Sequence, residues 1–285
     1  MATIKASAPA KVNLTLHVTG QRGDGYHLLD SLVVFADVAD QLTATTAPDM
    51  RLSVSGPFSP GVPSDHTNLI MRAAETLRAV RGVKLGAALM LEKHLPHAAG
   101  IGSGSSDAAA TLAMLAELWR VAPLPATAPE VAALGADVPV CVGAPRPARM
   151  SGIGDVLSPV ASLPDCALVL VRPPVDVPTP EVFKRLGTKD GSPMLQLREG
   201  LDYEGFVRWL MAQRNDLQTP AEAIAPEITE AIARLKSLPA VSVVGMSGSG
   251  ATCFAVVKDM ATARHVARIV QVARMEWWVA PAALL

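Results

Sequence analysis

The chain has 285 residues, and half of them are apolar, so it can bury a large core as one large domain or as two smaller ones. Its formal net charge of −1 excludes a broad electrostatic field for nucleic acid or for an anionic membrane. Its cysteines, Cys141, Cys166 and Cys253, are odd in number and far apart, which argues against a disulfide framework or a CxxC metal site and favours a reducing cytoplasm. Because the N-terminus lacks an apolar signal segment and no apolar run approaches the roughly 18 residues that span a bilayer, we expect no membrane among its partners.

Residues 10–18 alternate strictly between polar and apolar side chains, which predicts a half-buried strand. The polar side holds Lys11, Asn13, Thr15 and His17. Lys11 and Asn13 therefore point the same way. From the pattern alone, these side chains either face solvent or converge on one substrate.

A turn is predicted at residues 22–27, because Asp24 and Gly25 favour a tight reversal, and the apolar residues 31–36 predict the returning strand. Tyr26 and His27 leave this turn together. They either pack and hydrogen-bond locally or present a ring and an imidazole to a ligand.

Residues 67–81 predict a scaffold helix with a buried apolar stripe. The stripe consists of Leu69, Ile70, Ala73, Ala74, Leu77 and Val80.

The stretch PHAAGIGSGSS at residues 96–106 combines a glycine-rich loop with a predicted helix start. Three glycines can adopt backbone angles closed to other residues and leave main-chain N–H groups uncovered: Gly100, Gly102 and Gly104. Three candidate helix caps follow: Ser105, Ser106 and Asp107. Apolar residues at helical spacing then predict a helix of about four turns, whose positive end faces the loop. The stretch predicts a polyphosphate site, with an ordinary capped turn as the alternative.

This loop matches neither of two common phosphate fingerprints. A dinucleotide fingerprint needs a third glycine at the position of Ser105, and a P-loop needs a Gly-Lys pair, which the chain lacks. Another class of nucleotide-binding protein is therefore expected to use it.

Pro129 and Glu130 predict the first turn of a helix that ends at Gly135, and Asp137 then precedes the apolar residues 138–142, which predict a strand. An aspartate at such a junction is either a turn former or a catalytic base.

The C-terminal part predicts strands and helices around a second glycine-rich loop. Residues 164–174 predict a short buried strand, a helical stretch from about residue 215 restarts at Pro226, and residues 241–245 and 253–257 predict two strands. The SerGlySerGly sequence at 247–250 joins these two strands as a plain hairpin loop or as part of a phosphate site. Residues 185–200 predict a surface loop with no clear role.

Five segments resemble the GHMP kinase superfamily, in the same order and with similar spacing. They are residues 8–16, 24–27, 96–106, 135–139 and 245–251. The AspGlyTyrHis element at 24–27 is the specific part, and it resembles the family of 4-diphosphocytidyl-2-C-methyl-D-erythritol kinases of the non-mevalonate isoprenoid pathway.

The resemblance implies a two-domain α+β fold. A ribosomal-protein-S5-like βαβ domain at residues 1–158 would carry the phosphate loop and the catalytic residues, and a ferredoxin-like α/β domain would follow at residues 159–285. It also implies ATP-dependent phosphorylation of the 2-hydroxyl of a small-molecule substrate with a cytidine diphosphate group, with ATP and Mg²⁺, by a cytoplasmic monomer or weak homodimer. It names no metal-binding residue.

The resemblance also implies the roles of individual residues. Asp137 would accept the proton of the substrate hydroxyl, with Lys11 next to it. The substrate would contact Asn13, Tyr26, His27, Thr179 and Phe183. Phe183 would hold the cytosine opposite Tyr26, with a core position in a short helix as its alternative. ATP would bind at Pro96, His97, Ala98, Ala99, Gly100, Ile101, Gly102, Ser103, Gly104, Ser105 and Ser106, with the loop at 247–250 in support.

Two competing interpretations stay open. A homoserine or mevalonate kinase of the same superfamily would have no use for Tyr26 and His27, and a non-catalytic nucleotide-binding member would be expected to lack Lys11 or Asp137, which are both present. One departure bears on ATP: Ser103 stands where the family generally has glycine, so it must keep an ordinary backbone angle or cost roughly 1 kcal/mol.

Overall fold

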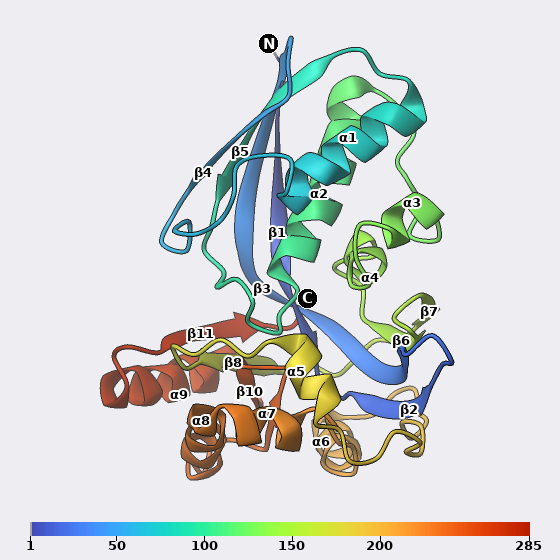
Figure 1. Ribbon diagram of the computed structural model, residues 1–285. Helices are drawn as coiled ribbons and strands as arrows, with labels where there is room; N and C mark the ends of the chain where they lie inside the picture. Colours follow the sequence, from blue (N-terminus) through green and yellow to red (C-terminus); the bar gives the residue numbers. More distant parts are fainter. Residues whose placement is uncertain (1) are drawn as a thin grey trace. The chain divides into compact units, whose positions relative to one another are not determined.

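The computed structural model describes residues 2–285, in which strands and helices are mixed along the chain (Figure 1). The strands are β1 (Thr3–Asn13), β2 (His17–Gln21), β3 (His27–Ala47), β4 (Arg51–Ser55), β5 (Gly86–Glu92), β6 (Ala148–Gly152), β7 (Val156–Pro159), β8 (Ala167–Arg172), β9 (Val243–Met246), β10 (Cys253–Val257) and β11 (Trp278–Ala283). The helices are α1 (Leu69–Arg81), α2 (Ser103–Trp119), α3 (Pro129–Ala132), α4 (Val138–Val142), α5 (Thr179–Lys184), α6 (Tyr203–Met211), α7 (Gln218–Ile224), α8 (Pro226–Lys236) and α9 (Met260–Ala273). The predicted α+β class is confirmed.

The chain forms two compact units. The first takes in the residues up to Ala10, Val38–His97 and Gly102–Pro145, and the second takes in Lys11–Asp37, Ala98–Ile101 and Arg146–Leu285. Strands β1 and β3 contribute residues to both units. The domain division at residues 158 and 159 stays a prediction.

In the first unit, helices α1 and α2 lie side by side against a small sheet (Figure 1). β4 pairs with β5 in parallel, and β5 pairs antiparallel with residues 41–47 of β3. The Asn68 side chain caps α1 by accepting a hydrogen bond from the Ile70 N–H at 2.9 Å, and Gly82 ends the helix with φ 64°. Four of the six predicted stripe residues are buried. Leu69, the first residue of the helix, is only partly buried, and Val80 is 41% exposed because it lies in the last turn, at the edge of the stripe.

The second unit contains a four-stranded antiparallel sheet in the order β11-β8-β10-β9, with α8 and α9 packed against it. The predicted strands around residues 164–174 and 241–257 and the helix restart at Pro226 are confirmed. β2 pairs with β3, β3 pairs with β6, and β6 pairs with β7, all antiparallel. Leu16 and Val18 join the core of this unit together with residues of β8, α8 and β10.

The predicted single strand at residues 10–18 is wrong in two respects. β1 ends at Asn13 and β2 begins at His17, because the main chain changes partner between them: Leu14 N–H donates to Leu32 at 2.9 Å, whereas Leu16 N–H donates to Arg214 at 2.9 Å. Both sides of the segment are buried, since Lys11, Asn13, Thr15 and His17 are each at most 3% exposed. Internal hydrogen bonds replace the water that the pattern predicted on the polar side.

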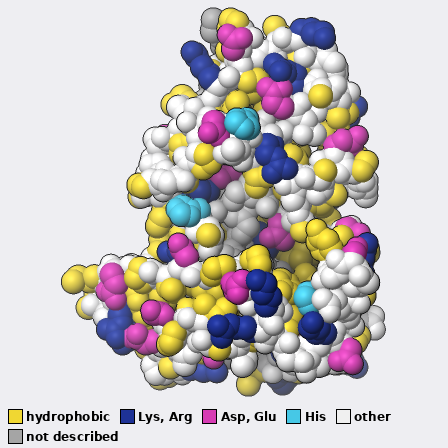
Figure 2. Space-filling view, in the orientation of Figure 1, with side chains coloured by type: hydrophobic (Ala, Val, Ile, Leu, Met, Phe, Trp, Pro, Cys, Tyr) yellow, Lys and Arg dark blue, Asp and Glu magenta, His cyan; other side chains and the backbone are white. Residues whose placement is uncertain are grey.

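The surface carries charges of both signs. On the face drawn in Figure 2, Lys and Arg side chains are interspersed with Asp and Glu, in keeping with the small net charge. Across residues 2–285, every helix is too short or too polar to cross a bilayer.

Candidate active site

Lys11 and Asn13 lie next to each other at the end of β1. The Lys11 Nζ donates to the Asn13 Oδ1 at 2.8 Å, so the two side chains do share one side of the strand. The Asn13 Nδ2 donates to the Ser31 Oγ at 2.8 Å, and the Lys11 N–H donates to the Ile101 carbonyl at 3.0 Å. These contacts join the end of β1 to β3 and to the glycine-rich loop.

The glycine-rich loop connects β5 to α2 and turns through left-handed backbone angles. Gly100 has φ 75° and Gly102 has φ 58°, and Ala98 takes the same region with φ 51°. The helix of about four turns is confirmed, but Gly102 occupies the N-cap position and no side chain caps the helix. The predicted capping is therefore wrong: Ser105, Ser106 and Asp107 lie inside the helix. Ser103 is its first residue and keeps an ordinary backbone angle.

The first main-chain N–H groups of α2 have no acceptor within the helix and form its positive end. Ser106 Oγ does not cap them, because it donates to the Pro9 carbonyl at 2.7 Å. The N-terminus of this 17-residue helix can therefore bind the negative charge of a phosphate group.

The second glycine-rich loop, residues 247–250, packs on residues 98–101 of the first. Ser247 Oγ donates to the Gly100 carbonyl at 2.8 Å and accepts from the Asn13 N–H at 3.0 Å. The Thr252 N–H donates to the Ala99 carbonyl at 3.1 Å. A side chain at Gly100 would place its Cβ 2.7 Å from the Gly250 carbonyl oxygen, so only glycine allows this approach.

A buried cluster of three charged residues, which was not predicted from the sequence, lies at the stems of the first loop. The Lys93 ammonium pairs with Asp40 and with Asp107, the latter at 2.7 Å, and all three side chains are at most 4% exposed. Asp40 also accepts the N–H groups of His94 and Leu95 at 2.6 and 2.8 Å. Burial raises the pKa of Asp107 to about 7, against the opposing effect of Lys93. The signal in the sequence was one charged residue on each side of the loop: Lys93 directly after β5 and Asp107 in the first turns of α2.

Asp137 occupies the N-cap position of α4, in the first unit, whereas Lys11 belongs to the second unit. The strand predicted at residues 138–142 is wrong, because Val138–Val142 forms a short helix. Pro139 lies in its first turn, where main-chain N–H groups have no partner within the helix, so the missing N–H of proline costs nothing there. The predicted helical turn at Pro129 is confirmed as α3.

His27 and Phe183 form a stacked pair in the second unit. Their ring centroids are 4.8 Å apart and their planes differ by 24°. Among the described residues, the buried His27 Nε2 has no hydrogen-bond partner, and burial lowers the pKa of this imidazole. Tyr26, which directly precedes His27 in the sequence, is 62% exposed. Thr179 Oγ1 lies 2.6 Å from Ser249 Oγ of the second loop.

The comparisons with known proteins agree on one family. The model of the GHMP kinases N terminal domain matches residues 68–158, and that of the GHMP kinases C terminal domain matches residues 197–274.

Curated relatives match over nearly the whole chain. The 4-diphosphocytidyl-2-C-methyl-D-erythritol kinase of Dinoroseobacter shibae is 51% identical over 99% of this chain and 95% of its own, and that of a Cereibacter sphaeroides strain is 50% identical over 99% of both. A solved structure of 4-(cytidine 5'-diphospho)-2C-methyl-D-erythritol kinase superposes with a TM-score of 0.80 at 32% identity, covering 98% of each chain. The chain therefore belongs to the GHMP kinase family, among its 4-diphosphocytidyl-2-C-methyl-D-erythritol kinases.

Proposed function

We propose residue roles for this kinase, which phosphorylates the 2-hydroxyl of 4-diphosphocytidyl-2-C-methyl-D-erythritol with ATP and releases ADP. The activity rests on full-length relatives that carry this name at about half identity. The observation that carries the assignment of the substrate site is the stacked pair of His27 and Phe183, in which the buried Nε2 has no partner among residues 2–285. A cytosine can pack on such rings, and a ring nitrogen can bond its polar edge.

The cytidyl half of the substrate then contacts Tyr26, His27 and Phe183. Tyr26 supplies an exposed aromatic surface next to the pair, and the low pKa of His27 keeps its imidazole neutral, so that it can donate or accept. Asn13 and Thr179 bind the remainder of the substrate. Support for these two is their contact with Ser247 and Ser249 of the second glycine-rich loop.

ATP binds along residues 96–106, with its phosphates at the N-terminus of α2. The support is the run of left-handed residues that ends in an uncapped helix N-terminus. The loop at 247–250 holds this stretch in shape without contacting the reacting atoms.

Asp137 acts as the general base and Lys11 as its electrostatic partner. Phosphoryl transfer requires the acceptor oxygen to be aligned with the γ-phosphate, and a carboxylate can take the hydroxyl proton as the new bond forms. An ammonium group stabilises the ionised carboxylate and the negative charge that develops on the phosphoryl oxygens.

Mg²⁺ enters with the nucleotide in this proposal. Among the described residues, no three His, Cys, Asp or Glu side chains gather as a metal-binding group, so the ion would be held by the nucleotide phosphates and water. Bound Mg²⁺ neutralises phosphate charge and usually keeps several waters.

Cysteine spacing, net charge and the extent of the family match bear on the cellular setting and on the domain division. We place the kinase in the cytoplasm, as a monomer or weak homodimer that has only small molecules as partners, because its three cysteines are widely spaced and its net charge is small. The division into domains at residues 1–158 and 159–285 is supported by the N-terminal family model, whose match ends at residue 158.

The test is ADP release with MgATP and 4-diphosphocytidyl-2-C-methyl-D-erythritol, run beside homoserine and mevalonate. We expect turnover with the cytidyl substrate alone, and Asp137→Asn should lose about 10²- to 10⁴-fold in kcat while it still binds ATP. Glu130→Gln, an exposed carboxylate on the neighbouring helix α3, is the matched control and should keep full activity. Near-normal turnover of Asp137→Asn would remove it from the mechanism.

A further inference from the structure

Residues 187–202 contain no helix or strand, yet the middle of this segment is firmly attached. A surface loop without a clear role was predicted at residues 185–200, whereas Met194 is only 5% exposed and residues 189–195 bond to β2, β3 and the turn before α7. We call residues 189–195 the strap.

Asp30 of β3 is the centre of one attachment. It is 4% exposed, and its two oxygens accept from the Arg149 Nε at 2.7 Å and the Arg149 Nη2 at 2.5 Å, a bidentate ion pair. The same carboxylate accepts the Met194 N–H at 2.9 Å. Met194 is held a second time, because Thr15 Oγ1 donates to its sulfur at 3.1 Å.

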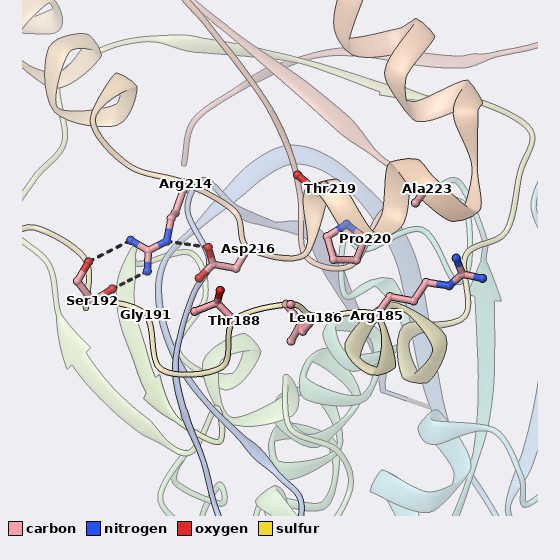
Figure 3. Close-up of a pocket in the computed structure, with 11 residues that line it drawn as sticks. Arg185, Leu186, Thr188, Gly191, Ser192, Arg214, Asp216, Thr219, Pro220 and Ala223 are labelled. Carbon is pink, nitrogen blue, oxygen red and sulfur yellow. Dashed lines mark hydrogen bonds and ion pairs between the residues drawn. The ribbon is translucent and has the colours of Figure 1, made fainter.

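Arg214 makes a second attachment at Ser192, two residues before Met194 in the strap. Figure 3 shows its guanidinium between Ser192 and Asp216: it donates to the Ser192 carbonyl at 2.7 Å and to Asp216 Oδ1 at 2.7 Å. Asp216 in turn accepts the Val18 N–H at 2.7 Å, and the Gly191 N–H donates to the Val18 carbonyl at 3.0 Å. The strap is therefore bonded to β2 through its main chain as well as through side chains.

The strap joins the two halves of the substrate clamp. His27 lies three residues before Asp30 on β3, and β2 pairs with this part of β3, with Gln21 opposite His27. On the other side, Phe183 lies in α5, which ends at Lys184, only five residues before the strap begins. Leu186, between them, is buried in the same core as Leu16 and Val18. Losing the attachment to Asp30 therefore removes one of the strap's two attachments and loosens the connection that sets α5 against His27.

We propose that Asp30 and Arg149 are positioning residues for the cytidyl half of the substrate, because their ion pair fastens the strap and thereby fixes Phe183 against His27. This rests on the proposed clamp of His27 and Phe183. The pair does not touch the reacting atoms, so its loss weakens substrate binding and leaves the chemical step unchanged. The hydrogen bonds that the Arg149 guanidinium donates to Asp30 raise the pKa of Arg149, in keeping with a pair that stays charged.

The test is a comparison of Asp30→Leu with Asp37→Leu. Asp37 lies on the same strand and also accepts a main-chain N–H, but from Ala283 of β11, at 2.6 Å, instead of from the strap. We expect Asp30→Leu to raise the KM of the cytidyl substrate about tenfold or more, with kcat and the KM of ATP within about threefold of wild type. Asp37→Leu should leave all three within about threefold, and Asp30→Asn, which keeps an acceptor for Met194, should recover part of the loss. Calorimetric titration with cytidine 5'-monophosphate gives an independent reading of the same change.

Two results for Asp30→Leu would overturn the proposal. One is an unchanged KM for the cytidyl substrate, and the other is a fall in kcat with rises of similar size in the KM values of both substrates. If Asp30→Leu does not fold, Arg149→Gln carries the same prediction, since the Arg149 side chain is 35% exposed and tolerates a shorter amide. Phe183→Ala separates this proposal from the clamp itself. If it leaves the cytidyl KM unchanged, the clamp fails; if it raises that KM while the Asp30 and Arg149 variants do not, only the role of the strap fails.

Discussion

The contact between the two glycine-rich loops predicts opposite effects for two Gly→Ala changes in one motif. Gly100→Ala forces alanine into φ 75°, which costs about 1–2 kcal/mol. Its Cβ would lie 2.7 Å from the Gly250 carbonyl oxygen and closer still to that of Ser247, and both are main-chain atoms that cannot rotate away. The loops must separate, which weakens the bonds from Ser247 Oγ to Gly100 and from Thr252 to Ala99, each worth about 0.5–1.5 kcal/mol. After allowing for the stiffer unfolded chain, the net loss is about 2–4 kcal/mol.

Gly104→Ala is the matched control. Gly104 lies within α2, and an added Cβ would meet only Leu69 Cδ1 at 3.7 Å, an ordinary contact, so the helix gains about 0.5–1 kcal/mol. Urea unfolding without nucleotide, followed by circular dichroism, measures both free energies of unfolding. If Gly100→Ala lies within about 0.5 kcal/mol of wild type, the loops are not held by this close approach and the reasoning is refuted.

Two further predictions concern charge and backbone in the same region. Because the pKa of Asp107 is raised in the folded state, its contribution to stability is fully present below its unfolded pKa of 3.8 and is lost as pH rises to about 7. In urea unfolding, the stability of the non-titrating Asp107→Asn relative to wild type should therefore increase by about 2 kcal/mol between about pH 5 and about pH 7. A difference that does not change with pH would contradict the raised pKa. Ala98→Gly should relieve the left-handed angle at that residue and raise the free energy of unfolding by up to about 1 kcal/mol. The control, Ala99→Gly, changes a buried residue without a left-handed angle and should lower the free energy of unfolding by about 1 kcal/mol. Equal effects of the two changes would show that Ala98 is not strained.

Local patterns predicted much of the fold because each carried its own physical signal. The helix after the phosphate loop, the restart at Pro226 and the hairpin around 247–250 all follow from spacing, proline and glycine. The strand predicted at residues 138–142 was wrong because a short apolar run does not distinguish a strand from a buried helix. Pro139 does not decide between them, since proline is tolerated both in the first turn of a helix and in an edge strand.

The candidate site was predicted where its residues lie in short motifs and missed where partners are distant in sequence. Lys11 and Asn13 could be placed together from a spacing of two, as their bond shows. Asp30 is more than a hundred residues from both Arg149 and Met194, and no periodicity relates them. The burial of the polar side of residues 10–18 was equally beyond a period-two pattern, which shows that a face is polar but not whether protein or water bonds it.

The way β1 and β3 are shared between the two units constrains how the chain can fold during synthesis. Residues 11–37 are made early, but Leu16 and Val18 pack in a core with residues of β8, α8 and β10, and the Leu16 N–H bonds to Arg214 almost two hundred residues later. Contacts that close so large a loop form slowly, since its entropy is lost before any of them stabilises the chain. The N-terminal strands of the second unit therefore cannot complete their packing until most of the polypeptide has left the ribosome, and until then their apolar side chains lack the core that buries them.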